Sequence, residues 1–200
     1  MQKLSLFNSD VFFSKAGVEE QRVDLFKQIM SAKKKTNENI PNSNTDCWRT
    51  FAEWKNIDWL YDHVINETKR ALEYYTNENI DEEFKRVTEN DKQISLVSWT
   101  NVNSSGSKNV IHDHKEFSFS AIYYVSAEGT GPIIFKNPAN LLSNCTNKSP
   151  FTRTVTIRPK NGHMILWPSW IPHEVEPNPS KEDRVNVVFN IMIGKPPTAS

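Results

Sequence analysis

Three histidines and one arginine are the residues of this chain whose types and spacing could do chemistry. His112 and His114 are two apart, just before an alternating apolar stretch at 117–125, and His173 follows a segment rich in tryptophan and proline. Residues two apart on a strand point to the same face, so His112 and His114 can converge on one metal ion, with His173 closing the set from a distant strand. Arg184, eleven residues beyond His173, could aim a guanidinium at a carboxylate. The pattern favours a redox-metal enzyme with an acidic co-substrate.

Three interpretations of the histidine cluster are open from the sequence. Imidazole suits iron, copper, zinc and nickel, so the histidines alone do not name the metal. Non-haem iron oxygenases usually combine two histidines with one carboxylate, and Asp113 lies between His112 and His114. Strand alternation points Asp113 to the opposite face, which favours three histidine ligands and a neutral ligand set. A bulge that turns Asp113 inward is the other possibility, and a chance occurrence of unrelated histidines is the third.

The strand that contains Arg184 is expected to bind an anion. Arg184 and Asn186 share one face of the strand, among valines that would bury them. A buried arginine needs an anionic partner, and its planar guanidinium pairs bidentately with a carboxylate. The alternative partner is structural, a salt bridge to Glu174 or Asp183. Tyr124 has the same parity as the second histidine, so its hydroxyl is expected to reach the site as well.

The remaining sequence predicts a short extended segment around 11–13, then helices, then strands. Apolar residues recur at helical spacing over 18–32 and 58–75, and the polar stretches 37–46 and 140–150 are expected to be loops that shape a substrate site. After residue 92 the period changes to two. Short strands are expected at 94–99, 118–125, 132–135, 152–157, 163–167, 173–176 and 184–193. Many short strands with regular turns indicate a jelly roll, so the predicted class is α+β, a jelly-roll, cupin-like core with the N-terminal helices packed on one sheet.

Length and composition limit the function classes. The 200 residues suit a single domain, with 1–90 as mainly helical support and 91–200 as the jelly-roll core. The 24 basic and 24 acidic residues cancel, so no strong nucleic-acid signal exists. Cys47 and Cys145 are too few for a disulfide scaffold and indicate reduced thiols in the cytoplasm. No apolar run is long enough to span a membrane. A homodimer is left open. Among six tryptophans, Trp48 and Trp170 are the choices to line a substrate cleft.

Several motifs together resemble one known family. These motifs are His112-Asp113-His114, SAIYYV at 120–125, GPIIFKNP at 131–138, GHMILWPSWIPHEV at 162–175 and DRVNVVFN at 183–190. They resemble a family of 2-oxoglutarate/Fe(II)-dependent oxygenases of marine bacteria and their phages. CWRT at 47–50 and WTNVN at 99–103, with Ser43-Asn44, are also similar. The family is distantly similar to prolyl hydroxylases and shares their double-stranded β-helix.

The resemblance implies a function and its cofactors. It implies Fe(II) held by His112, His114 and His173, with 2-oxoglutarate and O₂ as co-substrates. Arg184 would bind the far carboxylate of 2-oxoglutarate, helped by Tyr124 or Asn186. The expected reaction is hydroxylation of a peptide residue or a small molecule, with release of succinate and CO₂, in a bacterial or phage-infected cytoplasm. The alternatives are a cupin-like three-histidine dioxygenase that does not use 2-oxoglutarate, and a non-catalytic binding protein.

Overall fold

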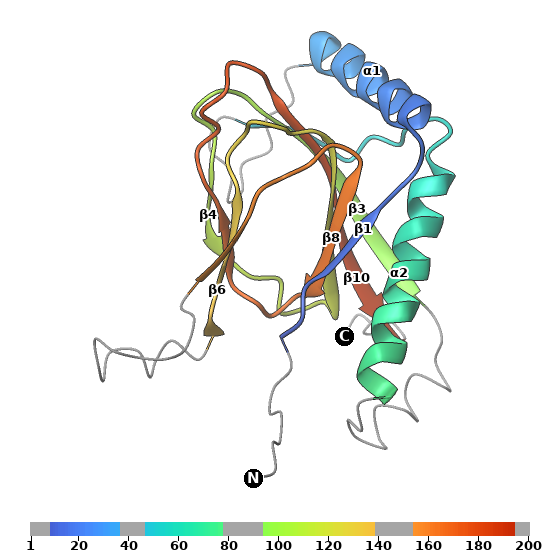
Figure 1. Ribbon diagram of the computed structural model, residues 1–200. Helices are drawn as coiled ribbons and strands as arrows, with labels where there is room; N and C mark the ends of the chain where they lie inside the picture. The colour runs from blue at the N-terminus through green and yellow to red at the C-terminus, as the bar shows by residue number, and fades with distance from the viewer. Residues whose placement is uncertain (1–8, 37–46, 78–93, 139–153, 195–200) are drawn as a thin grey trace, which may run out of the picture.

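The computed structural model describes residues 9–36, 47–77, 94–138 and 154–194, which form two helices and ten strands (Figure 1). The helices are α1 (Glu19–Lys35) and α2 (Asp58–Asn77). The strands are β1 (Phe12–Lys15), β2 (Cys47–Thr50), β3 (Ile94–Asn103), β4 (Asn109–His112), β5 (Phe119–Ser126), β6 (Ile133–Lys136), β7 (Thr154–Ile157), β8 (His163–Pro168), β9 (His173–Val175) and β10 (Arg184–Ile193).

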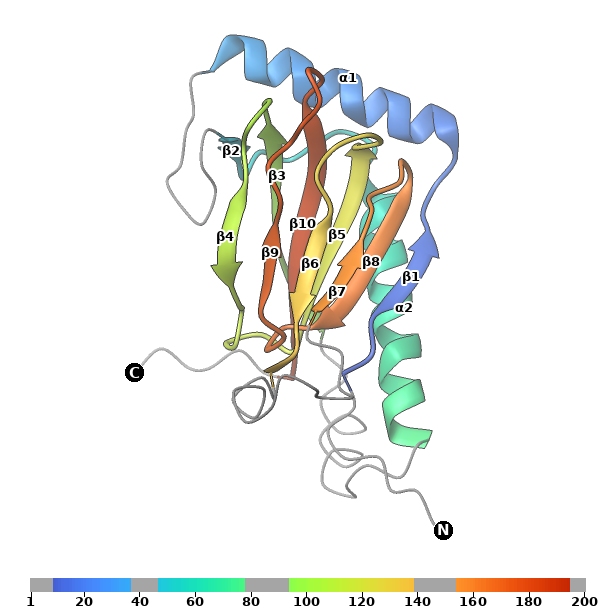
Figure 2. The ribbon, with the colours of Figure 1, turned by 60° about the vertical axis from the view of Figure 1, so that its left-hand side comes forward.

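The strands form two antiparallel sheets that face each other. The larger has six strands in the order β1-β8-β5-β10-β3-β2, and the smaller has four in the order β4-β9-β6-β7. Figures 1 and 2 show both helices outside the six-stranded sheet, with α2 along its outer face and α1 crossing near one end of its strands. The space between the sheets is therefore lined by their inner faces. This arrangement confirms the predicted two helices and mostly antiparallel strands.

The central strands are buried on both faces because helices cover one face and the second sheet covers the other. Alternate residues of β5 and β10 divide between two cores. Tyr123 and Phe189 pack outward against the helices, where their rings lie 5.6 Å from Trp59 and 5.4 Å from Tyr61. Their chain neighbours Ile122, Tyr124 and Val188 point inward, to the smaller core and the cavity.

Helix α1 has a well-marked beginning and end. Gly17 adopts a positive φ of 68° just before the helix, and the Gln21 side chain accepts a hydrogen bond of 3.0 Å from the Val18 backbone N–H. Acidic residues fill the first turn and three lysines the last, as the helix dipole favours. Leu25 and Ile29, one turn apart, are its buried residues and attach it to the outer core.

The sequence predicted most elements but missed two short strands. Both helices agree within three residues at each end, and 184–193 coincides with β10. The strands β2 and β4 were missed, because four residues give too little alternation to identify a strand. The expected loops at 37–46 and 140–150 lie outside the described residues. Neither described helix is long and apolar enough to cross a membrane.

Candidate active site

The three histidines meet between the sheets. His112 ends β4 and His173 begins β9, and the two are cross-strand partners in the four-stranded sheet. His114 follows β4, and its backbone N–H donates a hydrogen bond of 2.9 Å to the Ser169 carbonyl. One ring nitrogen from each histidine lies within 4.8 Å of those of the other two. This spacing is suited to three ligands of one metal ion.

The expectation that His112 and His114 share one strand is wrong in detail. Strand β4 ends at His112, and the chain turns after His114, where the Phe117 N–H donates to the His114 carbonyl at 2.9 Å. The two rings still converge, with centroids 5.0 Å apart. The convergence therefore comes from a strand end followed by a turn and not from regular alternation.

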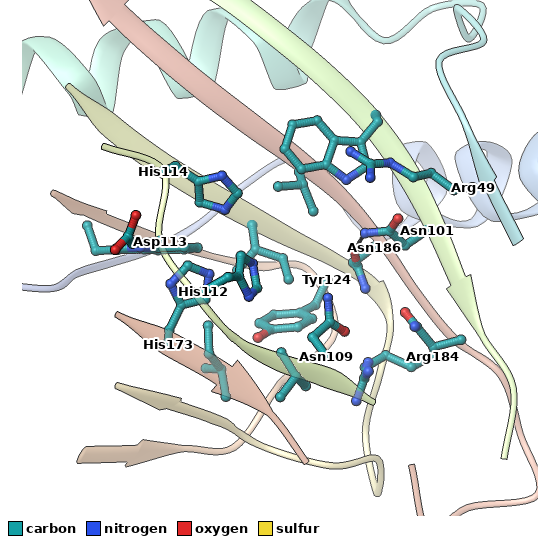
Figure 3. Close-up of a pocket in the computed structure, with 17 residues that line it drawn as sticks. Arg49, Asn101, Asn109, His112, Asp113, His114, Tyr124, His173, Arg184 and Asn186 are labelled. Carbon is teal, nitrogen blue, oxygen red and sulfur yellow. Dashed lines mark hydrogen bonds between the residues drawn. The ribbon is translucent and has the colours of Figure 1, made fainter. Parts of the chain in front are cut away.

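Asp113 lies outside the cluster of ring nitrogens. Its carboxylate pairs with Lys115, with 3.0 Å between Oδ2 and Nζ. Among the described residues, the group with metal-ligand spacing contains the three histidines alone. Figure 3 shows the Asp113 carboxylate turned away from the space between the histidines and Arg184. This geometry favours three histidine ligands over the alternative in which Asp113 replaces His114.

Two of the histidines are oriented by carbonyl groups of their own chain. Nδ1 of His112 lies 2.7 Å from the Val110 carbonyl oxygen, and Nδ1 of His173 lies 3.1 Å from that of Ile171. A carbonyl oxygen can only accept, so Nδ1 carries the proton in both rings and Nε2 keeps a free lone pair. Nε2 is then the atom available to a metal ion.

Burial keeps all three imidazoles neutral. It lowers the pKa of His173 to about 3 and that of His114 to about 4, with a further contribution in both from the neighbouring His112. It also lowers the pKa of His112. Because a metal binds only unprotonated imidazole, the cluster is in its binding form at neutral pH.

The other three predicted site residues line the same cavity, on the inner face of the six-stranded sheet. Asn186 of β10 is directly opposite Tyr124 of β5, so both side chains point the same way, and Arg184 precedes Asn186 by two residues and has the same parity. The structure therefore brings Arg184, Asn186 and Tyr124 together with the histidines. Figure 3 shows Arg184 across the cavity from His114, with the Tyr124 ring between Arg184 and the other two histidines.

Arg184 is almost fully buried, at 1% exposure, yet has no acidic partner among the described residues. Within the described segments its Nη1 donates to two backbone carbonyls, those of Gly131 at 3.3 Å and Glu176 at 3.4 Å, and its Nη2 has no hydrogen-bond partner there. Glu174 pairs instead with Lys136 at 2.5 Å and Asp183 with Lys33 at 2.6 Å. The structural salt bridge considered from the sequence is therefore wrong, and the Nη2 donor is left over inside the cavity.

Sequence reasoning missed part of the cavity wall. The further polar and aromatic lining residues are Arg49, Trp99, Asn101, Asn103, Asn109 and Trp167. Cross-strand pairing explains the asparagines, since Asn101 pairs with Asn186 and Asn103 with Arg184. The alternation of side chains in WTNVN at 99–103 could have predicted that Trp99, Asn101 and Asn103 face the cavity. Trp48 and Trp170, chosen from the sequence as cleft residues, do not line this cavity: Trp48 packs in the outer core, and the partly buried Trp170 packs against the inner one.

The segment that carries the site matches a known family. Residues 97–190 match the family described as "Putative 2OG-Fe(II) oxygenase". The match runs from β3 to β10 and includes all six predicted site residues. It confirms the family resemblance predicted from the sequence motifs. No curated protein matches the chain significantly.

Solved structures with the same fold are distant in sequence. A prolyl-4-hydroxylase from Pseudomonas putida has a TM-score of 0.58 at 10% identity, over 91% of each chain. A prolyl hydroxylase from Trichoplax adhaerens, in complex with a hypoxia inducible factor peptide fragment, has a TM-score of 0.60 at 13% identity, over 91% of this chain and 83% of that one. The non-heme alpha ketoglutarate dependent carbocyclase SnoK from nogalamycin biosynthesis has a TM-score of 0.63 at 10% identity, over 90% and 79%. At such identities the likeness establishes the fold.

Proposed function

We propose, since residues 97–190 belong to the 2OG-Fe(II) oxygenase family, that this protein is an Fe(II)- and 2-oxoglutarate-dependent oxygenase built as one domain over residues 1–200. Its core would be the double-stranded β-helix, or jelly roll, of such enzymes, with residues 91–200 as the core and 1–90 as support. The observation that carries the proposal is the unpaired Nη2 of buried Arg184 in the same cavity as three convergent histidines.

The three histidines fit an iron ion. In this proposal Nε2 of His112 and His173 and one nitrogen of His114 are the ligands, and all three enter as neutral imidazoles. Three protein ligands on one side leave positions open for co-substrate and O₂. A neutral set leaves more positive charge on the ion than a set with a carboxylate. When bound, iron and 2-oxoglutarate supply the oxidising chemistry, in which O₂ is consumed, succinate and CO₂ are released and the substrate is oxidised.

Arg184 fits the far carboxylate of 2-oxoglutarate. A carboxylate would supply the acceptor that Nη2 lacks, and it would neutralise a charge that burial disfavours, as the lowered pKa of this guanidinium shows. Tyr124 is 2% exposed and its phenol O–H, whose pKa burial raises, stays protonated as a hydrogen-bond donor. Asn186, opposite Tyr124 on the neighbouring strand β10, offers a second neutral donor. These residues would position the co-substrate and exclude water around it.

The oxidised substrate is proposed to be a peptide residue or a small molecule. Among the similar structures, the Trichoplax enzyme is in complex with a peptide fragment, and SnoK comes from nogalamycin biosynthesis. The segments 37–46 and 140–150, proposed to shape the substrate site, lie outside the described residues. A cytoplasmic location is part of the same proposal.

The test is anaerobic titration of the purified protein with Fe(II) and 2-oxoglutarate, followed by visible absorption. We expect the weak charge-transfer band of the iron–2-oxoglutarate chelate in the wild-type protein. Arg184→Ala should bind iron normally and weaken 2-oxoglutarate by at least about tenfold, because a buried charge-assisted pair is lost. Arg70→Ala, a control at an exposed arginine that pairs with Glu67, should behave as wild type.

The set of three histidines favours one second candidate, a cupin-like dioxygenase that does not use 2-oxoglutarate. Iron bound by the histidines without a chelate band on adding 2-oxoglutarate, and no effect of Arg184→Ala on any ligand, would favour it. A protein that binds no iron would be a non-catalytic binding protein. Each outcome is read from the same titration.

A further inference from the structure

A second arginine lies in the same cavity and is not explained by the co-substrate. Arg49 belongs to β2, the edge strand of the six-stranded sheet, and is 6% exposed. Its guanidinium carbon lies 4.5 Å from the centre of the Trp99 ring and 5.3 Å from that of Phe51. Two aromatic rings therefore hold the guanidinium in place by cation–π contact.

Arg49 has no acidic partner among residues 9–36, 47–77, 94–138 and 154–194. No ion pair of these residues includes it, and its Nε is buried with no hydrogen-bond partner. Desolvation by burial lowers the pKa of this guanidinium. Burying a charged group without an acceptor is costly, and the rings that hold it cannot accept in the plane of the guanidinium. The group is thus held ready for an anion that the described part of the chain does not provide.

The position of Arg49 differs from that of Arg184. Arg49 pairs across the sheet with Asn101, which pairs in turn with Asn186 of β10. Strand β2 is two strands away from β10, roughly 10 Å at the usual spacing between neighbouring strands. Figure 3 shows Arg49 and Arg184 apart, with Asn101 and Asn186 between them. One carboxylate bound by Arg184 would therefore not also pair with Arg49.

Arg49 is also close to the histidines. The Trp99 ring against which it stacks lies 6.2 Å from the His114 ring, and Arg49, His112 and His114 line one cavity. Phe51 is 54% exposed and lies 6.5 Å from Trp99, so the stack extends from the cavity to the surface. An anionic group bound at Arg49 would therefore lie in the same cavity as the histidines.

We infer that Arg49 binds a carboxylate of the molecule that is oxidised, so that the substrates of this protein are organic acids. This inference rests on the proposed function, in which Arg184 holds the co-substrate. A carboxylate matches the planar fork of one guanidinium. The cavity of about 190 Å³ is smaller than the roughly 300–1,000 Å³ of pockets for drug-sized ligands, which favours a small acid.

The test uses protein loaded with Zn(II), which does not react with O₂, and with saturating 2-oxoglutarate. Isothermal titration with a panel of small organic acids and with the primary amide of each measures the contribution of the negative charge. We expect acids to bind at least tenfold more tightly than their amides. Arg49→Met, which keeps the length and the contact with Trp99, should remove this difference and leave 2-oxoglutarate affinity within twofold. Arg49→Lys should retain part of it, because the charge remains without the planar fork.

The controls separate this inference from the proposed function. Arg70→Met should retain the full preference for acids, and circular dichroism checks that each variant is folded. If 2-oxoglutarate itself does not bind the Zn(II)-loaded wild-type protein, the proposed function fails. If 2-oxoglutarate binds normally but no acid of the panel does, or acids bind Arg49→Met as tightly as wild type, only the inference about Arg49 is overturned. A tenfold loss of 2-oxoglutarate affinity in Arg49→Met would overturn it too, by placing Arg49 with the co-substrate.

Discussion

Two of the three histidines take their orientation from a carbonyl two residues earlier, Val110 for His112 and Ile171 for His173. The acceptor belongs to the backbone, so the tautomer of each ring depends on the local chain path and not on a neighbouring side chain. His114 differs, since its Nδ1 lies 3.4 Å from Nδ2 of Asn190, which also contacts Ser120.

The role of His173 can be tested by replacing it. His173→Ala removes one of the three proposed ligands from the buried centre of the cavity, so tight binding of Fe(II) or Zn(II) should be lost. Because the ring also packs 5.1 Å from Trp167, we expect the free energy of unfolding to fall by about 1–3 kcal/mol, with the fold retained. Metal content after dialysis and urea unfolding measure the two effects. His163→Ala, at a histidine outside the cavity, should keep the metal; full occupancy in His173→Ala would refute the three-histidine site.

At the scale of elements, parity along a strand decided which site residues the sequence could predict. Arg184, Asn186 and Tyr124 were found because long strands alternate regularly and their inner faces could be followed by counting. Arg49 was missed because β2 has four residues and its pairing with β3 depends on contacts distant in sequence. The error at Trp48 has the same cause, since Trp48 and Arg49 are neighbours on β2 and point to opposite faces. The position of His114 after β4 likewise depends on a contact distant in sequence, the hydrogen bond from its backbone N–H to the Ser169 carbonyl.

The loop before β6 positions Arg184, and Gly131 is where this can be tested. A Cβ at Gly131 would collide with the Glu176 carbonyl oxygen and lie 2.6 Å from that of Pro177. Gly131 and Glu176 supply the two carbonyls to which Arg184 donates. Gly131→Ala should therefore lower the free energy of unfolding by about 2 kcal/mol or more and weaken 2-oxoglutarate by about tenfold or more, because the guanidinium is displaced.

Gly129→Ala is the matched control in the same turn. Gly129 has a φ of 77°, and an added Cβ would have no neighbour within 4 Å, so the methyl costs about 1–2 kcal/mol of backbone strain and moves neither carbonyl. Its 2-oxoglutarate affinity, measured by the same titration, should match wild type. Equal losses of affinity in the two variants would show that the loop acts through general stability and not through Arg184.

At the scale of the whole molecule, the proposed site joins the two sheets. His112 and His173 belong to the four-stranded sheet, whereas Arg184 belongs to the six-stranded sheet. A metal ion that also binds 2-oxoglutarate would therefore connect the sheets across the cavity. Binding to the native state alone stabilises the folded protein by an amount that grows with the logarithm of the ligand concentration above Kd.

Metal and co-substrate should raise the melting temperature in two separable steps. A ligand at one hundred times its Kd adds about 2.7 kcal/mol, which for a chain of this length corresponds to about 5–10 °C. We expect Zn(II) to give one increment and 2-oxoglutarate a second, measured by calorimetry. His173→Ala should show neither, and Arg184→Ala should show the first in full and a clearly smaller second. A 2-oxoglutarate increment that persists without metal would contradict the joint site.

The aromatic rings around the histidines give the molecule an internal optical reporter. Trp167 lies 5.1 Å from His173, and Trp99 lies 6.2 Å from His114, centre to centre. A paramagnetic ion held by these histidines would quench the fluorescence of both indoles, whereas tryptophans in the outer core would continue to emit. Trp99 alone also contacts Arg49. Measuring the fluorescence of variants that lack either Trp99 or Trp167 would thus distinguish binding of the ion from binding of an acid, in unlabelled protein and in real time.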